Sequence, residues 1–200
     1  MVRKAALGAG IFLLLLLIFL LAFSKTGKPE VELQTQGDLD GDGVIERYVW
    51  NSQALIVTEG TKVLWKSPQG YGIDRVVLAD PDNDGTDNVV VSLWKKGSFG
   101  KMRPFWYTGQ NDEYKNHLFV YKLQEKTLKP VWCSSNLAHP ILSIDIRDVD
   151  GDGLNELIVQ EGQYKKLTGN RYIVEPEGSA RTTVWQWQEW GFYADDRRKN

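Results

Sequence analysis

The sequence contains the nine-residue segment Asp148-Val-Asp-Gly-Asp-Gly-Leu-Asn-Glu156, and two further segments align with it without gaps, Asp38-Leu-Asp-Gly-Asp-Gly-Val-Ile-Glu46 and Asp80-Pro-Asp-Asn-Asp-Gly-Thr-Asp-Asn88. Each has aspartate at its first, third and fifth positions and glycine at its sixth. An apolar, strand-favouring stretch follows each one, such as Leu157-Ile-Val159 after the last. Three copies of one pattern predict three copies of one structural unit. We call residues 38–46, 80–88 and 148–156 the first, second and third loops.

Each repeat extends beyond its loop. Leu64-Trp65-Lys66-Ser67 precedes the second loop and Val131-Trp132-Cys133-Ser134 precedes the third, so a tryptophan-bearing strand closes one unit shortly before the next begins. No segment after residue 30 shows helical periodicity. The predicted strands are Val31–Gln36, Arg47–Asn51, Ala54–Thr58 and Lys62–Lys66, then Asp74–Ala79, Asn88–Lys95, His117–Lys122 and Lys129–Ser134, then Leu142–Arg147, Glu156–Gln160, Thr182–Trp187 and Trp190–Ala194. The sequence therefore predicts an all-β, β-propeller-like fold of about three four-stranded antiparallel blades.

Two units carry a long insertion between their second and third strands, Gly97–Asn116 and Lys165–Ala180. In an antiparallel unit this connection leaves the end opposite the loops, so the insertions should lie together there. The first insertion contains Arg103, Phe105, Trp106 and Tyr107, and aromatic residues with an arginine are typical of interfaces. We interpret these residues as candidates for binding a partner; the alternative is that they pack over the blade.

The alternating carboxylates of the loops suit calcium, a hard cation that takes six to eight oxygen ligands. In a tightly curled loop every second side chain turns inward, and the glycines allow the curl. The seventh residue would offer its backbone carbonyl, and the ninth would complete the shell. Magnesium is the weaker candidate because it prefers to keep bound water. The predicted ligands, for up to three calcium ions, are Asp38, Asp40, Asp42, Val44 and Glu46; Asp80, Asp82, Asp84, Thr86 and Asn88; and Asp148, Asp150, Asp152, Leu154 and Glu156.

Two other interpretations of the loops are possible in principle. An EF-hand needs a glutamate at position twelve and helices on both sides. Here position twelve is Val49, Val91 or Val159, and the flanking segments are predicted strands. None of the three loops therefore fits an EF-hand. The other is an acidic turn that binds nothing, which three loops in register disfavour. We expect the second loop to bind most weakly, because its ninth residue is the neutral Asn88.

The loops, lying between two strands and repeated with a tryptophan-bearing closing strand, resemble the FG-GAP (VCBS-like) repeats of integrin α-subunit propellers and many bacterial surface proteins. The resemblance covers roughly residues 31–194. It implies that calcium binds between the first two strands of each blade and that partners bind mostly on the opposite face. A closed propeller usually has four to eight blades, whereas this chain has three repeats. The alternatives are a small three-bladed body, an open arc, or a homo-oligomer in which another copy completes the ring.

The N-terminus carries a membrane signal. Residues 5–23 contain no charged side chain, and Arg3 and Lys4 precede them. As a helix of about 1.5 Å per residue this segment spans roughly 28 Å, close to one hydrocarbon core. Its length favours an uncleaved anchor over a signal peptide cut near Ala22-Phe23-Ser24. We therefore expect a signal-anchor or signal peptide in residues 1–28 and an ectodomain in residues 29–200, at the cell membrane as a single-pass protein with its C-terminal domain outside the cytoplasm, or secreted.

Composition limits the function classes. A net charge of −2 and a pI near 5.8 argue against a nucleic-acid partner. One cysteine, Cys133, rules out an intrachain disulfide, and no nucleotide-binding or nucleophile motif occurs. We expect a non-catalytic, calcium-binding domain with a binding or structural role at the cell surface and a protein or glycan partner. The alternative is a calcium-dependent carbohydrate-active enzyme or its accessory subunit.

Overall fold

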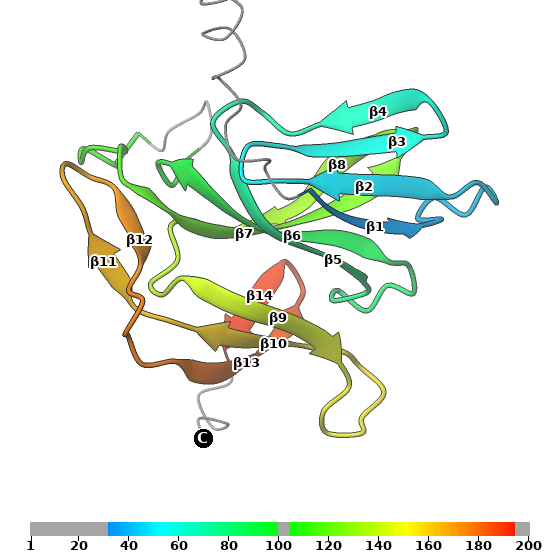
Figure 1. The fold of residues 1–200 in the computed structure, drawn as a ribbon. Helices are drawn as coiled ribbons and strands as arrows, with labels where there is room; N and C mark the ends of the chain where they lie inside the picture. The colour runs from blue at the N-terminus through cyan, green and yellow to red at the C-terminus, as the bar shows by residue number, and fades with distance from the viewer. Residues whose placement is uncertain (1–31, 100–104, 195–200) are drawn as a thin grey trace, which may run out of the picture. The chain divides into compact units, whose positions relative to one another are not determined.

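The computed structural model describes residues 32–99 and 105–194 (Figure 1). In these two ranges the chain forms fourteen β-strands and no helix, which confirms the all-β prediction. None of the described residues belongs to a helix able to cross a membrane. The N-terminal helix predicted within residues 1–28, and the candidate Arg103, lie outside the described residues.

Twelve strands form three four-stranded antiparallel sheets, and two form a separate hairpin. The first sheet contains β1 (Leu33–Gly37), β2 (Glu46–Trp50), β3 (Leu55–Glu59) and β4 (Lys62–Lys66). The second sheet contains β5 (Gly72–Ala79), β6 (Asn88–Lys96), β7 (Tyr114–Gln124) and β8 (Thr127–Cys133). The third sheet contains β9 (Ile141–Arg147), β10 (Glu156–Glu161), β13 (Arg181–Gln188) and β14 (Gly191–Ala194), and the hairpin consists of β11 (Tyr164–Lys166) and β12 (Tyr172–Val174).

The twelve sheet strands correspond one to one with the predicted strands. Their ends differ from the prediction by no more than three residues, and the largest difference is at the start of β7, predicted at His117 and found at Tyr114. The hairpin of β11 and β12 was not predicted and, apart from Tyr164, lies in the second insertion. The three predicted four-stranded antiparallel units are therefore confirmed.

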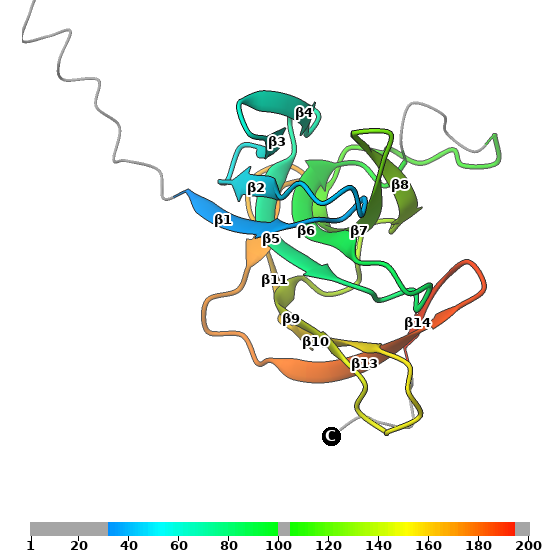
Figure 2. The same ribbon diagram turned by 90° about the vertical axis from the view of Figure 1, so that its right-hand side faces the viewer.

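The three sheets stack as layers, with the second sheet between the first and the third (Figure 2). Neighbouring sheets approach through their first strands, because β5 contacts both β1 and β9. No closed propeller forms within residues 32–99 and 105–194; the described sheets make an open stack of three. The described residues of a single chain therefore do not close into a ring by themselves.

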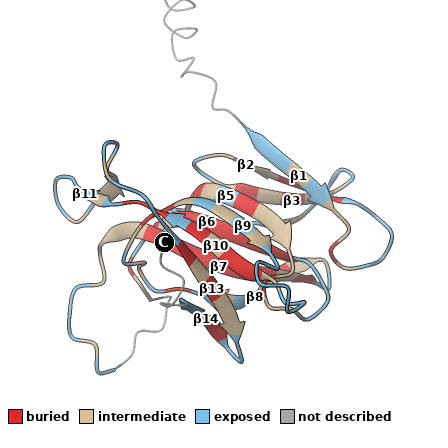
Figure 3. Cartoon of the chain, turned by 90° about the horizontal axis from the view of Figure 1, so that it is seen from below, coloured by how far each residue is buried: buried red, intermediate tan, exposed pale blue. Residues whose placement is uncertain are grey.

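The second sheet is buried on both faces, as the red colour along β6 and β7 shows (Figure 3). Val89 and Val91 pack against the first sheet, in a cluster that includes Tyr48. Val90 faces the other way and packs with Leu157 of the third sheet. A sheet covered on two sides needs an uninterrupted apolar strand, which explains the run of valines in β6. Burying each such side chain stabilises the fold by about 1.5–3 kcal/mol.

A pair of hydrogen bonds repeats where the fourth strand of a unit ends. Ser67 Oγ accepts from the N–H of Leu55 at 3.0 Å, and the N–H of Ser67 donates to the carbonyl of Leu55 at 2.9 Å. Ser134 makes the same two bonds with Leu118, at 2.9 and 3.0 Å. The two serines occupy the same place in the aligned tryptophan-bearing segments. The first two units therefore share their geometry well beyond the acidic loops.

The described parts of the two insertions lie together, at the end of the sheets opposite the loops, as predicted (Figure 1). The N–H of Tyr114 donates to the carbonyl of Asn170 at 2.7 Å. The side-chain amide of Asn170 donates to Asp112 at 2.9 Å, and the hydroxyl of Tyr172 donates to Glu113 at 3.0 Å. These bonds anchor the hairpin of β11 and β12 on the segment that leads into β7.

Candidate metal centres

The three loops occupy the same place in the three sheets, between the first and second strands. The strand register pairs Gly37 with Glu46 in the first sheet and Ala79 with Asn88 in the second. It pairs Arg147 with Glu156 in the third sheet. In every case the ninth loop residue is the first residue of the second strand, opposite the residue that precedes the first aspartate. Strand pairing therefore brings the two ends of each loop together.

The backbones of the three loops share a positive φ at the same two positions. The sixth residue has a positive φ in each, at 86° for Gly43, 87° for Gly85 and 88° for Gly153. The fourth residue also has a positive φ, at 73° for Gly41, 59° for Asn83 and 80° for Gly151. Glycine and asparagine tolerate this region best, so the sequence meets the requirement at all six positions.

The first aspartate of each loop organises the turn. Asp38 accepts from the N–H groups of Gly41 and Gly43, both at 2.8 Å. Asp148 accepts from those of Gly151 and Gly153 at 2.6 and 2.9 Å. The corresponding Asp80 accepts from Gly85 at 2.8 Å. These bonds curl the backbone around the carboxylates without using a metal, so they explain the loop shape and do not by themselves indicate an ion.

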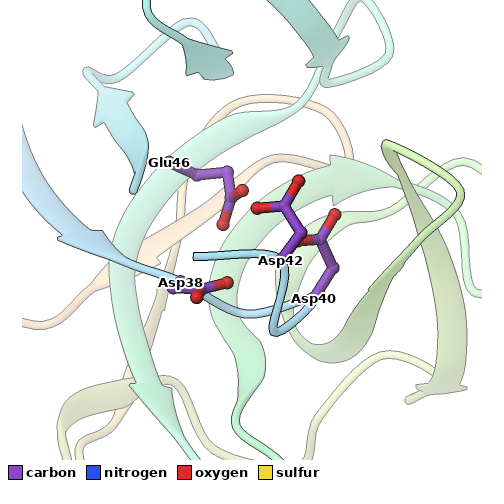
Figure 4. A group of neighbouring side chains, drawn as sticks. All are labelled: Asp38, Asp40, Asp42 and Glu46. Atoms are coloured by element: carbon purple, nitrogen blue, oxygen red, sulfur yellow. The ribbon is translucent and has the colours of Figure 1, made fainter. Parts of the chain in front are cut away.

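In the first loop the structure brings together all four predicted carboxylates. One oxygen from each of Asp38, Asp40, Asp42 and Glu46 lies within 4.8 Å of the others, and Figure 4 shows the four side chains gathered at the loop. Four negative charges at this separation repel one another, and a divalent cation with oxygen ligands would relieve the repulsion.

Glu46 supplies an independent observation that points to a cation. Its side chain is 0% exposed, and burial raises the pKa of its carboxyl group, opposed by the hydrogen bond from Leu39. Its Oε2 accepts from the N–H of Leu39 at 3.0 Å, whereas its Oε1 is buried without a hydrogen-bond partner among the described residues. A buried carboxylate oxygen without a partner is costly, and a metal ion bound in the loop would supply the missing partner.

The second loop is a smaller group of Asp80, Asp82 and Asp84, whose ligand oxygens lie within 4.8 Å of one another. Burial, together with the neighbouring Asp80 and Asp84 carboxylates, raises the pKa of Asp82 to about 6. Asn88, at the ninth position, is 0% exposed, and neither its side-chain oxygen nor its nitrogen has a hydrogen-bond partner in the described part of the chain. The loop thus has an unsatisfied buried amide where the first loop has a carboxylate.

In the third loop, Asp148, Asp150 and Glu156 lie within 4.8 Å of one another. Glu156 is buried, and its Oε2 accepts from the N–H of Val149 at 2.9 Å, which is the bond that Glu46 makes in the first loop. The predicted ligand Asp152 lies outside this group, and its Oδ1 accepts from the N–H of Leu154 at 2.8 Å.

The residues predicted to offer backbone carbonyls stand at the seventh position of each loop. The side chains of Val44 and Leu154 are exposed, so neither side chain is needed for packing. The hydroxyl of Thr86 donates to Asp84 at 2.7 Å. Coordination by these three carbonyls stays a prediction.

Two lysines of the second sheet contact the loops, and the sequence patterns did not indicate either of them. Lys122 forms an ion pair and hydrogen bond with Asp84, which lowers the pKa of that carboxyl group. Lys126 contacts Asp42 in the same way and lowers its pKa. The lysines lie 38 and 84 residues from these aspartates in the sequence, so no local pattern could reveal the contacts.

The second and third loops are joined directly. The N–H of Asn155 donates to the side-chain oxygen of Asn83 at 2.6 Å, and the side-chain amide of Asn83 donates to the carbonyl of Asn155 at 3.1 Å. The side-chain amide of Asn155 also donates to the carbonyl of Asp80 at 2.9 Å. These bonds fix two acidic loops side by side on neighbouring sheets.

The candidate partner-binding residues differ in exposure. Phe105 is 92% exposed and Trp106 is 72% exposed, and the two rings contact each other at 4.9 Å between centroids. Tyr107 is half-buried and packs against Phe99 at 4.8 Å between ring centroids. Tyr107 therefore packs within its own insertion, whereas Phe105 and Trp106 are exposed.

Comparison with known proteins gives no family assignment. No protein-family model and no curated protein matches the sequence. The resemblance to FG-GAP repeats therefore depends on the three loops and on the strands around them.

Proposed function

We propose that residues 29–200 form an extracytoplasmic, calcium-binding domain of the FG-GAP/VCBS-like type, with a non-catalytic binding or structural role at the cell surface, held at the membrane by the N-terminal segment. Three loops with a positive φ at the same two positions, each at the same place in a four-stranded sheet, support the repeat assignment. The three acidic groups support metal binding, and oxygen-only ligands in clusters of three or four carboxylates favour calcium.

The observation that carries this proposal is the buried, unpartnered Oε1 of Glu46. Acidic surface loops are common without an ion, but a fully buried carboxyl group that shares its space with three aspartates is destabilising in its charged form unless a cation neutralises it. Asp40 Oδ1 and Asp82 Oδ1 are also buried without a hydrogen-bond partner in the described ranges. These oxygens are the ones left available for an ion.

The loops should differ in affinity, and single substitutions test this order. Asp40→Ala and Asp150→Ala should each abolish one tightly bound calcium ion, because each removes a charged ligand from a group that includes a buried glutamate. Asp82→Ala should matter less, because the second loop has Asn88 in place of that glutamate. Isothermal titration calorimetry with calcium measures the number of sites and the affinity of each.

Asp87→Ala is the matched control for this series. It removes one negative charge from the second loop, but Asp87 is exposed and lies outside the acidic group. The control should retain every site. A titration in which the second loop proves to be the tightest site would refute the order.

The face opposite the loops is our proposed site for a protein or glycan partner, with Phe105 and Trp106 as exposed anchors. Replacing both by alanine should change the stability by no more than about 0.5 kcal/mol, because substitutions at exposed positions rarely do more. Calcium uptake should be unchanged, whereas attachment to a partner or cell surface should weaken. Thermal melts and calcium titration check the first two outcomes.

Tyr107→Ala is the comparison for that double variant, since Tyr107 is half-buried against Phe99. It should lower the melting temperature more than Phe105→Ala and Trp106→Ala together. If the double variant loses calcium or melts several degrees lower, these aromatic residues belong to the core and the docking proposal is wrong.

A further inference from the structure

Lys126 lies in the turn between β7 and β8 of the second sheet, and its ammonium group reaches three carboxylates of the first sheet. It lies 3.2 Å from Asp40 Oδ2 and 2.8 Å from Glu59 Oε2, and it forms a hydrogen bond with Asp42 Oδ2. Asp40 and Asp42 belong to the first loop, and Glu59 ends β3. One lysine thus joins a hairpin of one sheet to a candidate metal site of its neighbour.

The turn that carries Lys126 has an unfavourable backbone. β7 ends at Gln124 and β8 begins at Thr127, so Glu125 and Lys126 alone connect them, with φ values of 52° and 58°. A two-residue turn with positive φ at both positions normally contains asparagine and glycine. Residues with a Cβ adopt this conformation at a cost, and such positions persist where surrounding contacts hold them. The carboxylates around Lys126 are contacts of this kind.

The two oxygens of Asp40 have different surroundings. Its Oδ2 faces the Lys126 ammonium, whereas its Oδ1 is buried without a hydrogen-bond partner among the described residues, as is Oε1 of Glu46. A metal bound through these unpartnered oxygens would share the carboxylate of Asp40 with Lys126. Both cations would then lie within a few ångströms of each other, where like charges repel strongly.

We propose that Lys126 is a built-in counter-cation of the first loop: in the metal-free protein it neutralises Asp40 and Asp42 and ties the second sheet to the first, and a divalent cation in the loop weakens this tie. The inference rests on the proposed calcium binding and adds a regulating residue to it. Coupling between two ligands of one site is reciprocal, so a lysine that calcium repels must itself lower the affinity for calcium.

The test uses Lys126→Met, which keeps an unbranched side chain as far as the ε position and removes the charged ammonium group. It is made in the full chain together with Asp82→Ala and Asp150→Ala, so that the first loop is the remaining intact site. Calcium titration should show an affinity raised about tenfold by Lys126→Met. In chelator, the same substitution should lower the melting temperature, and saturating calcium should reduce that difference.

Lys129→Met is the matched control, because Lys129 lies three residues further along the same hairpin and pairs with Glu125. In the same Asp82→Ala, Asp150→Ala background it should leave the affinity within about twofold. Lys126→Arg should keep the affinity that this background has with Lys126, since it keeps the charge. Unchanged or lower affinity in Lys126→Met would overturn the inference while leaving the calcium proposal intact. Absence of calcium uptake by every chain, the unmodified one included, would overturn both.

Discussion

Calcium should raise the melting temperature of residues 29–200 substantially. An ion that binds only the folded state stabilises it by RT ln(1 + [L]/Kd), which is about 2.7 kcal/mol per site at a hundredfold excess over Kd. For a domain of this size each site then adds roughly 5–10 °C. The physical source is the repulsion among the carboxylates within each acidic group, together with the unpartnered oxygen of buried Glu46. A bound ion relieves both in the folded state, and without an ion only unfolding relieves them. Calorimetric melts in chelator and in millimolar calcium measure the effect.

Two comparisons separate specific binding from general screening by salt. Magnesium at the same concentration should give a smaller shift, because it resists losing its water ligands. The triple variant Asp40→Ala, Asp82→Ala and Asp150→Ala should give almost no calcium-dependent shift. Equal melting temperatures in chelator and in calcium for the unmodified domain would contradict this prediction.

Acid should destabilise the fold through His117. Its side chain is 0% exposed in the second sheet, and its Nδ1–H donates to the carbonyl of Ser134 at 3.2 Å. Burial, with the Lys95 ammonium nearby, lowers the pKa of His117 from 6.5 to about 4. The unfolded chain therefore binds a proton near pH 6.5 while the folded chain stays neutral. Stability from this residue is complete above pH 6.5 and is lost as the pH falls toward 4, by about 3 kcal/mol.

Denaturant titrations of His117→Gln and of the unmodified chain between pH 7 and pH 4, both in chelator, measure this effect as the difference between the two curves. This difference isolates the effect of His117. The pKa values of Glu46 and Asp82 are raised in the folded state, so these two groups increase the stability of the metal-free protein as the pH falls. His139→Gln is the control, since His139 is only half-buried, and it should keep the acid sensitivity. Parallel curves for His117→Gln and the unmodified chain would show that this histidine does not set the acid limit.

The strands and loops could be predicted from the sequence because they depend on local patterns. Alternating apolar residues, turn glycines and three aligned loops placed twelve strands with small errors. β11 and β12 could not be placed in this way, because each has three residues and their hairpin is fixed by distant partners such as Tyr114. The sequence did contain an indication that the second sheet lies in the middle of the stack. Val89 to Val91 form an unbroken apolar run, as expected for a strand that is covered on both faces.

The candidate site was predictable only in its local part. The spacing of the aspartates predicted the groups that the structure brings together, and Asp152 is the acidic residue that the grouping leaves out. Spacing could not indicate Lys122, which contacts Asp84 of the same sheet from 38 residues away. Nor could it indicate Lys126 or the Asn83–Asn155 pair, because these contacts join different sheets. Charge repeats in a sequence therefore identify candidate ligands, whereas the neighbouring charges that set their affinity depend on tertiary packing.

Native mass spectrometry of residues 29–200, with the metal content determined on the same sample, tests calcium binding most directly. The proposal predicts up to three bound calcium ions per chain, one fewer in Asp40→Ala and one fewer in Asp150→Ala. The same spectrum reports whether the chain is a monomer or a homo-oligomer that completes the ring. A domain that carries no calcium at millimolar concentration, or that keeps its full complement of ions after Asp40→Ala, would contradict the assignment of the acidic loops as calcium sites.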